Sequence, residues 1–232
     1  MSADLPATAL IRQNDTHRLI LSKSSAGGDS VLVRIANDDE HLRDIFDLDH
    51  ATNDRPLAEN GRLPAIGPHE LVFGIPYFRI VNAPFTHAHP LGSRFNGPDR
   101  GAWYAAFELK TSQAEVAFHK ATEYAEIGRY EDSVTYDDCL ADFSATLHTL
   151  RGDERFTACL APDSYLASQE LGEQLLAAGS LGLVYPSVRR AGGTCLACFA
   201  PAVVANVRKS STYRFEWTGT PQPKVTKTSG TG

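Results

Sequence analysis

The chain has 232 residues, of which 42% are hydrophobic and 22% charged, and its formal net charge is −6 with an isoelectric point near 5.7. A chain of this length supplies one substantial hydrophobic core and is short for two complete domains. The net negative charge argues against a surface whose main task is to bind nucleic acid or anionic lipid, although a local arginine cluster could still hold a small anion.

The first 70 residues differ in character from the remainder. A short strand is expected at residues 30–35, and a charged helix is expected to begin near Asn37. Prolines and glycines between residues 53 and 70 are typical of a loop or linker. We treat residues 1–70 as an N-terminal extension that could cover a cleft, mediate self-association or complete a sheet.

From residue 71 onward the pattern is richer in strands. Two helices are expected, one opened by Thr111 or Ser112 and ending near Gly128, and an amphipathic one at 163–178. Residues 221–232 have the composition of a disordered tail. Because strands dominate and helices are interspersed irregularly, the sequence favours an α+β fold over a doubly wound parallel sheet. The expected strands are 71–74, 77–81, 102–109, 142–147, 183–187 and 194–199.

Residues 92–116 carry the strongest chemical signal. Arg94 is expected in a glycine-bounded loop, Tyr104 in an aromatic strand and Glu115 in the first turn of a helix. A cation, a flat ring and a carboxylate suit a phosphate-bearing nucleotide with a scissile ribosyl bond.

Five short stretches occur in a characteristic order, and together they resemble the RES domain family over residues 71 to about 215. The chain departs from the family pattern at Phe95, where tryptophan is usual, and in its long N-terminal extension. The stretches are Tyr77-Phe78-Arg79, Gly92-Ser93-Arg94-Phe95-Asn96, Trp103-Tyr104-Ala105-Ala106, 111–116 and Tyr185-Pro186-Ser187-Val188-Arg189.

The resemblance implies an ADP-ribosyltransferase-like α+β fold, with two small, mostly antiparallel sheets around an NAD cleft and flanking helices, in a catalytic domain at 71–220. It implies the toxin of a bacterial toxin–antitoxin pair whose antitoxin carries an Xre-type DNA-binding domain. Family members consume NAD by hydrolysis or phosphorolysis of the nicotinamide–ribose bond, and some transfer ADP-ribose to a protein. NAD is then a substrate, inorganic phosphate is a candidate co-substrate, and no prosthetic group is expected.

Within this interpretation Glu115 is the expected catalytic carboxylate, because cleavage of the ribosyl bond builds oxocarbenium character that a nearby carboxylate stabilises. Arg94 and Tyr104 complete the expected catalytic set. The expected NAD-binding residues are Arg79 and Arg94 for the pyrophosphate, Tyr104 for the nicotinamide ring, Ser187 for a phosphate or the nicotinamide amide, and Asn96.

Each candidate also has an ordinary structural role open to it. Ser112-x-x-Glu115 is a capping box, which would begin a helix with no catalysis involved. Arg94 could form an ion pair with Asp99, and Tyr104 could pack in the core. Arg79 could face solvent from a strand, and Ser187 could belong to a turn. Two other functions remain open, namely an ADP-ribosyltransferase acting on a protein and a catalytically silent module that only binds a partner.

No metal site is expected. Cys195-x-x-Cys198 lacks the second pair of a zinc site and is flanked by apolar residues. The four cysteines are too few for a disulfide scaffold, and the sequence has neither a secretory signal nor an apolar run that would span a membrane. We therefore expect a cytoplasmic protein without a membrane partner. The remaining metal-like patterns are His87-x-His89, interpreted as a plain loop, and Glu115, His119 and Glu123, interpreted as a polar helix face.

Overall fold

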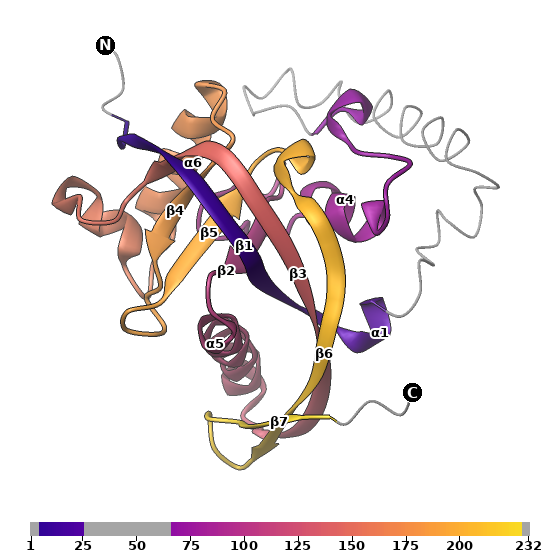
Figure 1. Ribbon diagram of the computed structural model, residues 1–232. Helices are drawn as coiled ribbons and strands as arrows, with labels where there is room; N and C mark the ends of the chain where they lie inside the picture. Colours follow the sequence, from indigo (N-terminus) through magenta and orange to yellow (C-terminus); the bar gives the residue numbers. More distant parts are fainter. Residues whose placement is uncertain (1–4, 26–65, 229–232) are drawn as a thin grey trace.

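The structure is a computed structural model that describes residues 5–25 and 66–228 (Figure 1). The predicted strand at 30–35, the predicted helix from Asn37 and most of the predicted linker lie outside the described residues. The elements, with η for a 3-10 helix, are β1 Thr8–Leu21, α1 Ser22–Ser25, η1 Pro68–Glu70, α4 Phe78–Thr86, β2 Trp103–Ala106, α5 Leu109–Ile127, β3 Glu131–Thr149, η2 Glu154–Leu160, α6 Leu166–Ala177, β4 Gly182–Pro186, β5 Thr194–Cys198, η3 Pro201–Val203, β6 Ala205–Thr218 and β7 Lys224–Lys227.

The strands form one seven-stranded sheet in the order β1-β2-β5-β4-β3-β6-β7, and β1 also pairs with β3. All pairs are antiparallel except β3 with β4. Because β1 pairs with both β2 and β3, the strands β1, β2, β5, β4 and β3 close into a ring. The α+β class is confirmed, whereas the expectation of two separate small sheets was wrong.

The sheet consists of two groups of strands that are joined to each other. The group β2-β5-β4 meets the group β1-β3-β6-β7 at two seams. At one seam His17 lies opposite Ala106, and at the other His148 and Thr149 of β3 lie parallel to Leu183 and Val184 of β4. These short seams fuse the two groups into a single sheet.

Strand β1 belongs to the N-terminal extension and was not predicted. It pairs with β3 from Thr8 opposite His148 to Leu21 opposite Tyr136, with a register shift between Gln13 and Thr16. Asp15 has a left-handed φ of 54° at this shift, so the alternation of side chains is interrupted within the strand. The described part of the extension therefore completes the sheet.

The prediction of a strand, or a pair of strands, around Pro76 at residues 71–74 and 77–81 was wrong. Phe78–Thr86 forms α4, which buries Val81 and Phe85 one helical turn apart. The Asn82 side chain donates to the carbonyl of Val72 at 2.8 Å and accepts from its N–H at 3.1 Å. This amide therefore satisfies backbone groups of residue 72 that a neighbouring strand would otherwise pair.

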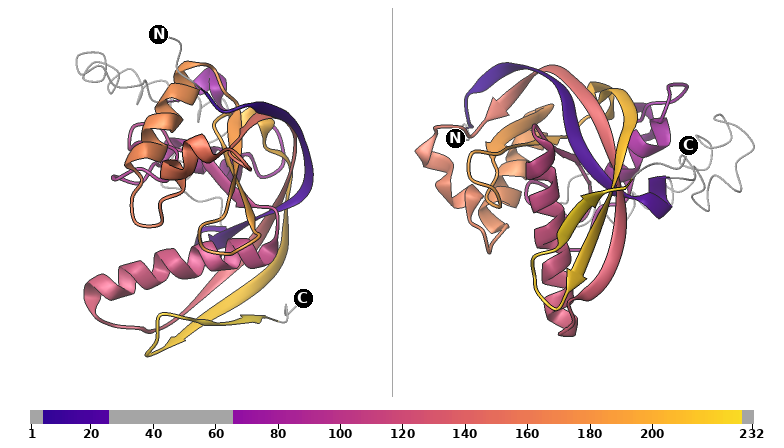
Figure 2. Two further views of the ribbon diagram at one scale, coloured as in Figure 1. Left: turned by 90° about the vertical axis from the view of Figure 1, so that its left-hand side faces the viewer. Right: turned by 60° about the horizontal axis from the view of Figure 1, so that its bottom comes forward.

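The two predicted helices are confirmed as α5 and α6, and each covers part of the sheet. Helix α5 lies along the concave side of the long strands β1, β3 and β6 (Figure 2), where Tyr124 packs with Tyr136, Phe215 and Trp217. Helix α6 packs through Leu171 and Leu175 on the side formed by β2, β4 and β5. Gly128 ends α5 in the left-handed region with φ 67°, as the sequence predicted.

The C-terminal segment is more ordered than expected. Residues 224–227, inside the predicted disordered tail, form β7 and pair with β6.

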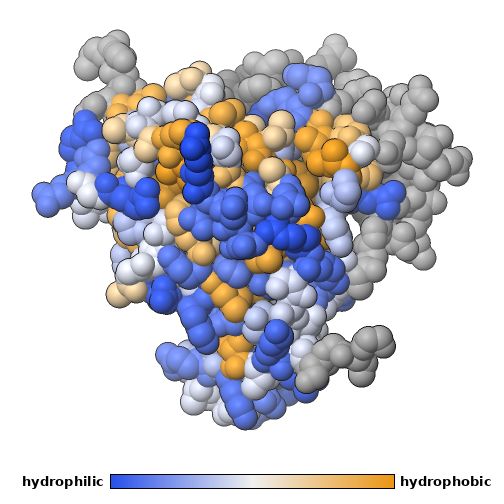
Figure 3. All heavy atoms as spheres, viewed as in Figure 1, coloured by the Kyte–Doolittle hydropathy of each residue, from blue (hydrophilic) through white to orange (hydrophobic). Residues whose placement is uncertain are grey.

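Hydrophobic and hydrophilic residues are interspersed on the face shown in Figure 3. In the described ranges, no helix combines the length and the apolar character needed to cross a membrane.

Candidate functional site

Helix α5 begins earlier than the sequence predicted, and this changes the interpretation of Glu115. The residue preceding the helix is Glu108, with extended backbone, so Ser112 and Glu115 both lie within the helix. Ser112 therefore caps nothing, and the interpretation of Glu115 as part of a capping box was wrong.

The carboxylate of Glu115 instead faces the ends of β4 and β5. Ser187 Oγ donates a hydrogen bond to Glu115 Oε1 at 2.7 Å, and Cys195 Sγ lies 3.5 Å from the same oxygen. Within the described residues, Glu115 Oε2 has no hydrogen-bond partner. The carboxylate is thus held through one of its two oxygens.

Ser187 also organises the turn that follows β4. Its Oγ accepts hydrogen bonds from the N–H groups of Arg189 and Arg190, both at 3.1 Å. The predicted turn role of Ser187 and its contact with Glu115 therefore coexist. The buried hydroxyl is orientated by three partners, which directs its proton to the carboxylate.

A second set of contacts locks this turn to the start of α5. Arg190 Nη1 donates to Thr111 Oγ1 at 3.1 Å, and Glu108 Oε2 accepts from Thr111 Oγ1 at 2.6 Å and from Thr194 N at 3.2 Å. The approach requires glycine at 193, because a Cβ there would lie 2.5 Å from Thr111 Oγ1. These hydrogen bonds fix the position of the turn that carries Ser187 relative to helix α5, which carries Glu115.

Arg94 is buried in the predicted loop, with 6% of its surface exposed. Its Nη1 donates to the carbonyls of Ala161 at 2.9 Å and Cys159 at 3.2 Å, and its guanidinium lies 4.7 Å from the centre of the Tyr165 ring. The loop containing Arg94 is thereby attached to the segment between η2 and α6.

Tyr104 and Asn96 form one hydrogen-bonded unit beneath this loop. Tyr104 Oη donates to Asn96 Oδ1 at 2.8 Å and accepts from Phe95 N at 2.9 Å. Burial raises the pKa of Tyr104 above its usual range, so the phenol is neutral. Asn96 is 1% exposed and its Nδ2 donates to the Gly97 carbonyl, which gives this amide a positioning role in the structure.

Arg79 lies on a different element from the other predicted site residues. It is on an exposed position of α4, with its guanidinium over the ring of Phe78, rather than on the predicted strand. Helix α4 packs against β2 and η3. The structure therefore brings Arg94, Tyr104, Glu115 and Ser187 into one region and places Arg79 on another element.

Several residues around the site were not predicted. Tyr185 packs edge-on against Phe95 with ring centres 4.7 Å apart, and Tyr165 lies under Arg94. The pKa of His119 is lowered, first by partial burial and then by the charges of Arg189 and Arg94, while the charge of Glu115 opposes this shift. Arg189 stands in one of the five stretches that resemble the family, which is the one signal that could have selected it.

The family model described as RES domain matches residues 71–218. The chain belongs to the RES domain family. A chain in the crystal structure of the M. tuberculosis MbcT–MbcA toxin–antitoxin complex is similar at 15% identity and a TM-score of 0.42, over 55% of this chain and 73% of that chain. None of the curated proteins matches this chain.

The RES domain match begins after β1, although β1 pairs along most of its length with β3, which lies inside the match. All six predicted site residues fall within the matched range. The RES domain of this protein therefore shares its sheet with a strand from outside the family model.

The two cysteines of β5 lie in different hydrophobic clusters. Cys195 packs beside Phe95 and Leu183, whereas Cys198 packs with Trp103 and Val184 in a different part of the core. Burial raises the pKa of the Cys198 thiol to about 12, so it is protonated. In the described part of the chain, no three His, Cys, Asp or Glu side chains cluster so as to hold a metal ion.

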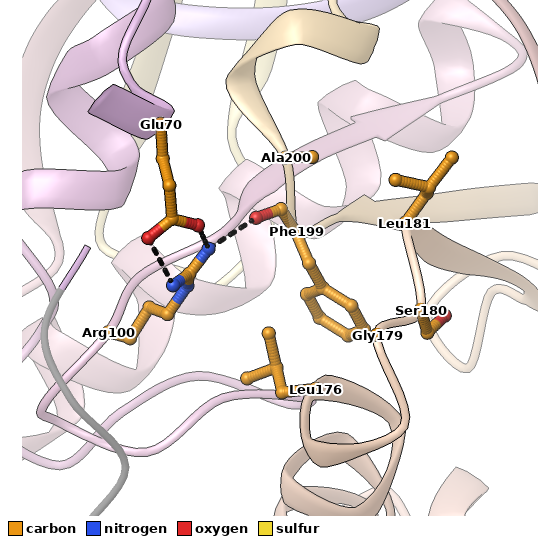
Figure 4. Close-up of a pocket in the computed structure, with 8 residues that line it drawn as sticks. All are labelled: Glu70, Arg100, Leu176, Gly179, Ser180, Leu181, Phe199 and Ala200. Carbon is orange, nitrogen blue, oxygen red and sulfur yellow. Dashed lines mark hydrogen bonds and ion pairs between the residues drawn. The ribbon is translucent and has the colours of Figure 1, made fainter. Parts of the chain in front are cut away.

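A pocket of about 260 Å³ opens elsewhere, between η1, the end of α6 and β5 (Figure 4). Arg100 binds both carboxylate oxygens of Glu70, at 3.1 and 2.5 Å, and donates to the carbonyl of Phe199 at 3.2 Å. None of the residues that line this pocket belongs to the region around Glu115, so it is separate from the candidate site.

Proposed function

We propose that this RES-domain protein cleaves NAD at the nicotinamide–ribose bond and acts as a toxin that an antitoxin with an Xre-type DNA-binding domain neutralises. The observation that carries the proposal is the Glu115 carboxylate, which Ser187 holds at 2.7 Å through one oxygen. The buried Arg94 and the neutral Tyr104 lie in the same region of the fold. The expectation of NAD as substrate comes from the family to which the chain belongs.

Cleavage of the nicotinamide–ribose bond is favoured by a fixed negative charge beside the ribose. As the C–N bond breaks, its electron pair goes to the pyridinium nitrogen, which leaves as neutral nicotinamide, and the ribosyl carbon gains oxocarbenium character. A preorganised carboxylate stabilises that positive charge without having to reorientate during the reaction. Glu115 Oε2, on the side away from Ser187, is suited to this role directly or through a ribose hydroxyl.

Arg94 and Tyr104 are assigned to binding. Arg94 offers a guanidinium for the pyrophosphate, because this planar cation binds phosphate oxygens in pairs. Tyr104 offers a ring face whose orientation the hydrogen bonds at its hydroxyl fix. Ser187 is assigned to orientating Glu115.

The acceptor decides the product. Attack by water yields ADP-ribose and a proton, attack by inorganic phosphate yields ADP-ribose 1-phosphate, and attack by a protein side chain yields an ADP-ribosylated protein. Each acceptor uses the same departure of nicotinamide. The activity is therefore a glycohydrolase, a phosphorylase or a transferase according to which nucleophile enters.

The test is to incubate the purified chain with NAD, with and without inorganic phosphate, and to measure free nicotinamide. Release is expected, and its dependence on phosphate separates phosphorolysis from hydrolysis. Radioactivity from adenine-labelled NAD that remains on protein indicates transfer. No release under any condition contradicts both enzymatic functions and leaves a module that only binds its partner.

A further inference from the structure

Two arginines converge on one loop beside the candidate site. Arg94 Nη1 donates to the carbonyl of Ala161 at 2.9 Å, and Arg189 Nη2 donates to the carbonyl of Pro162 at 2.6 Å. These carbonyls belong to consecutive residues, so the two guanidinium groups are neighbours although 95 positions separate them in the sequence. Their joint influence on the pKa of His119 agrees with this placement.

Each of these guanidinium groups lies on an aromatic ring. Arg94 is 4.7 Å from the centre of the Tyr165 ring, and Arg189 is 3.3 Å from the centre of the Phe118 ring. Contact with a ring face fixes the plane of the guanidinium while its N–H groups point along the plane. This is the geometry in which arginine binds phosphate oxygens in pairs.

Neither arginine is neutralised by a carboxylate within the described residues, whereas Arg100 pairs with Glu70 and Arg208 pairs with Asp15 and Asp142. Glu115, the nearby carboxylate, is bound to Ser187. Two buried or half-buried cations without a counter-charge, in a chain of net charge −6, form a local attraction for an anion. Arg189 Nε is in addition buried without a hydrogen-bond partner in the described structure.

We infer that Arg189 is the second arginine of the phosphate subsite and binds, together with Arg94, the pyrophosphate of the substrate. The inference rests on the proposed function for the identity of the substrate, but the anion site itself can be tested without turnover. It adds Arg189, from the turn after β4, to the residues expected to bind phosphate.

The binding test is calorimetry of the purified chain with inorganic pyrophosphate. Arg189→Gln is expected to weaken the affinity by about ten- to a hundredfold, the range for loss of charged hydrogen bonds. The exposed control Arg151→Gln is expected to bind as the wild type does. If Arg189→Gln does not fold, Arg189→Lys is measured instead, and it is expected to weaken binding several-fold because lysine offers no flat cation for the Phe118 ring.

The kinetic test compares NAD with nicotinamide riboside, which has the same scissile bond but no phosphate. Arg189→Gln is expected to raise KM for NAD and to leave kcat/KM for the riboside unchanged. Wild-type affinity for pyrophosphate in the variant, no binding by the wild type, or equal losses with both substrates would overturn the inference. Wild-type binding of pyrophosphate that depends on Arg189, without any cleavage of NAD, would uphold the subsite and contradict the proposed function.

Discussion

Ser187 Oγ and Glu115 Oε1 lie 2.7 Å apart, and this hydrogen bond joins the second turn of α5 to the turn after β4. Glu115 is therefore held from across the fold rather than by its own helix. A carboxylate turned back onto the backbone of its helix would be unavailable to a ligand, and Glu115 is not turned back in this way.

Replacement of Ser187 by alanine is expected to affect both the site and the turn. The variant loses the donor to Glu115 and the acceptor for the N–H groups of Arg189 and Arg190. We expect about 1–3 kcal/mol of destabilisation, since each lost hydrogen bond is worth roughly 1 kcal/mol, together with a lower kcat for NAD cleavage. Urea unfolding and initial rates measure the two effects, and full activity in Ser187→Ala would show that Glu115 needs no such support.

Gly172 of α6 is expected to tolerate no side chain. A Cβ at this position would lie 2.1 Å from the carbonyl oxygen of Phe95, next to Arg94. Gly172→Ala should therefore displace the Arg94 loop and cost about 1–3 kcal/mol, as overpacking does. The matched control is Gly97→Ala, whose Cβ would meet only Glu173 Oε1 at 3.7 Å. Equal melting temperatures for the two variants would contradict the packing described here.

Removal of residues 1–25 is expected to prevent folding of the RES domain. The deletion removes β1, whose pairing with β3 extends from Thr8 to Leu21, and so opens the ring of strands at the β1–β2 and β1–β3 pairings. It also removes Arg18, which donates to the carbonyl of Tyr104 at 2.9 Å. Circular dichroism and thermal melting of a chain that begins at residue 26 measure the effect. A cooperative transition close to that of the full chain would show that the extension is dispensable.

Acid should destabilise the protein partly through Asp137. Burial alone would raise the pKa of this carboxyl group, but hydrogen bonds from Lys209, Ser25 and Thr212 lower it from 3.8 to about 2. A depressed pKa in the folded state contributes stability above about pH 4 that disappears as the pH falls from about 4 to 2. Asp137→Asn should therefore flatten the fall of the melting temperature over this interval, whereas the exposed control Asp163→Asn should not.

The elements that could be predicted from the sequence are those with local signals. Gly128 after its last turn marked α5, apolar periodicity and Gly179 marked α6, and short apolar runs between turns predicted β2, β4 and β5. Residues 78–81 resemble a strand because three of the four are aromatic or β-branched. They nevertheless form part of helix α4, which buries Val81 and Phe85 on one face. Local propensity yields to tertiary packing at this point.

Long-range relationships could not be predicted. Strand β1 contains Asn14-Asp15 at its bulge, and its partner β3 begins more than a hundred residues later, so no local pattern marks it. The candidate site was predicted as an ordered set of residues, of which the structure gathers most and places Arg79 elsewhere. Arg189 was missed because its role depends on which carbonyl and which ring it contacts.

Nicotinamide release from NAD by the wild type and by Glu115→Gln tests directly whether this carboxylate is catalytic. The substitution keeps the size of the side chain and removes the charge that the oxocarbenium-like transition state requires. We expect at least about a hundredfold lower kcat at an unchanged melting temperature, while Glu123→Gln, on the exposed part of the same helix, retains wild-type rates. Wild-type release of nicotinamide by a folded Glu115→Gln variant would contradict the catalytic role proposed for Glu115.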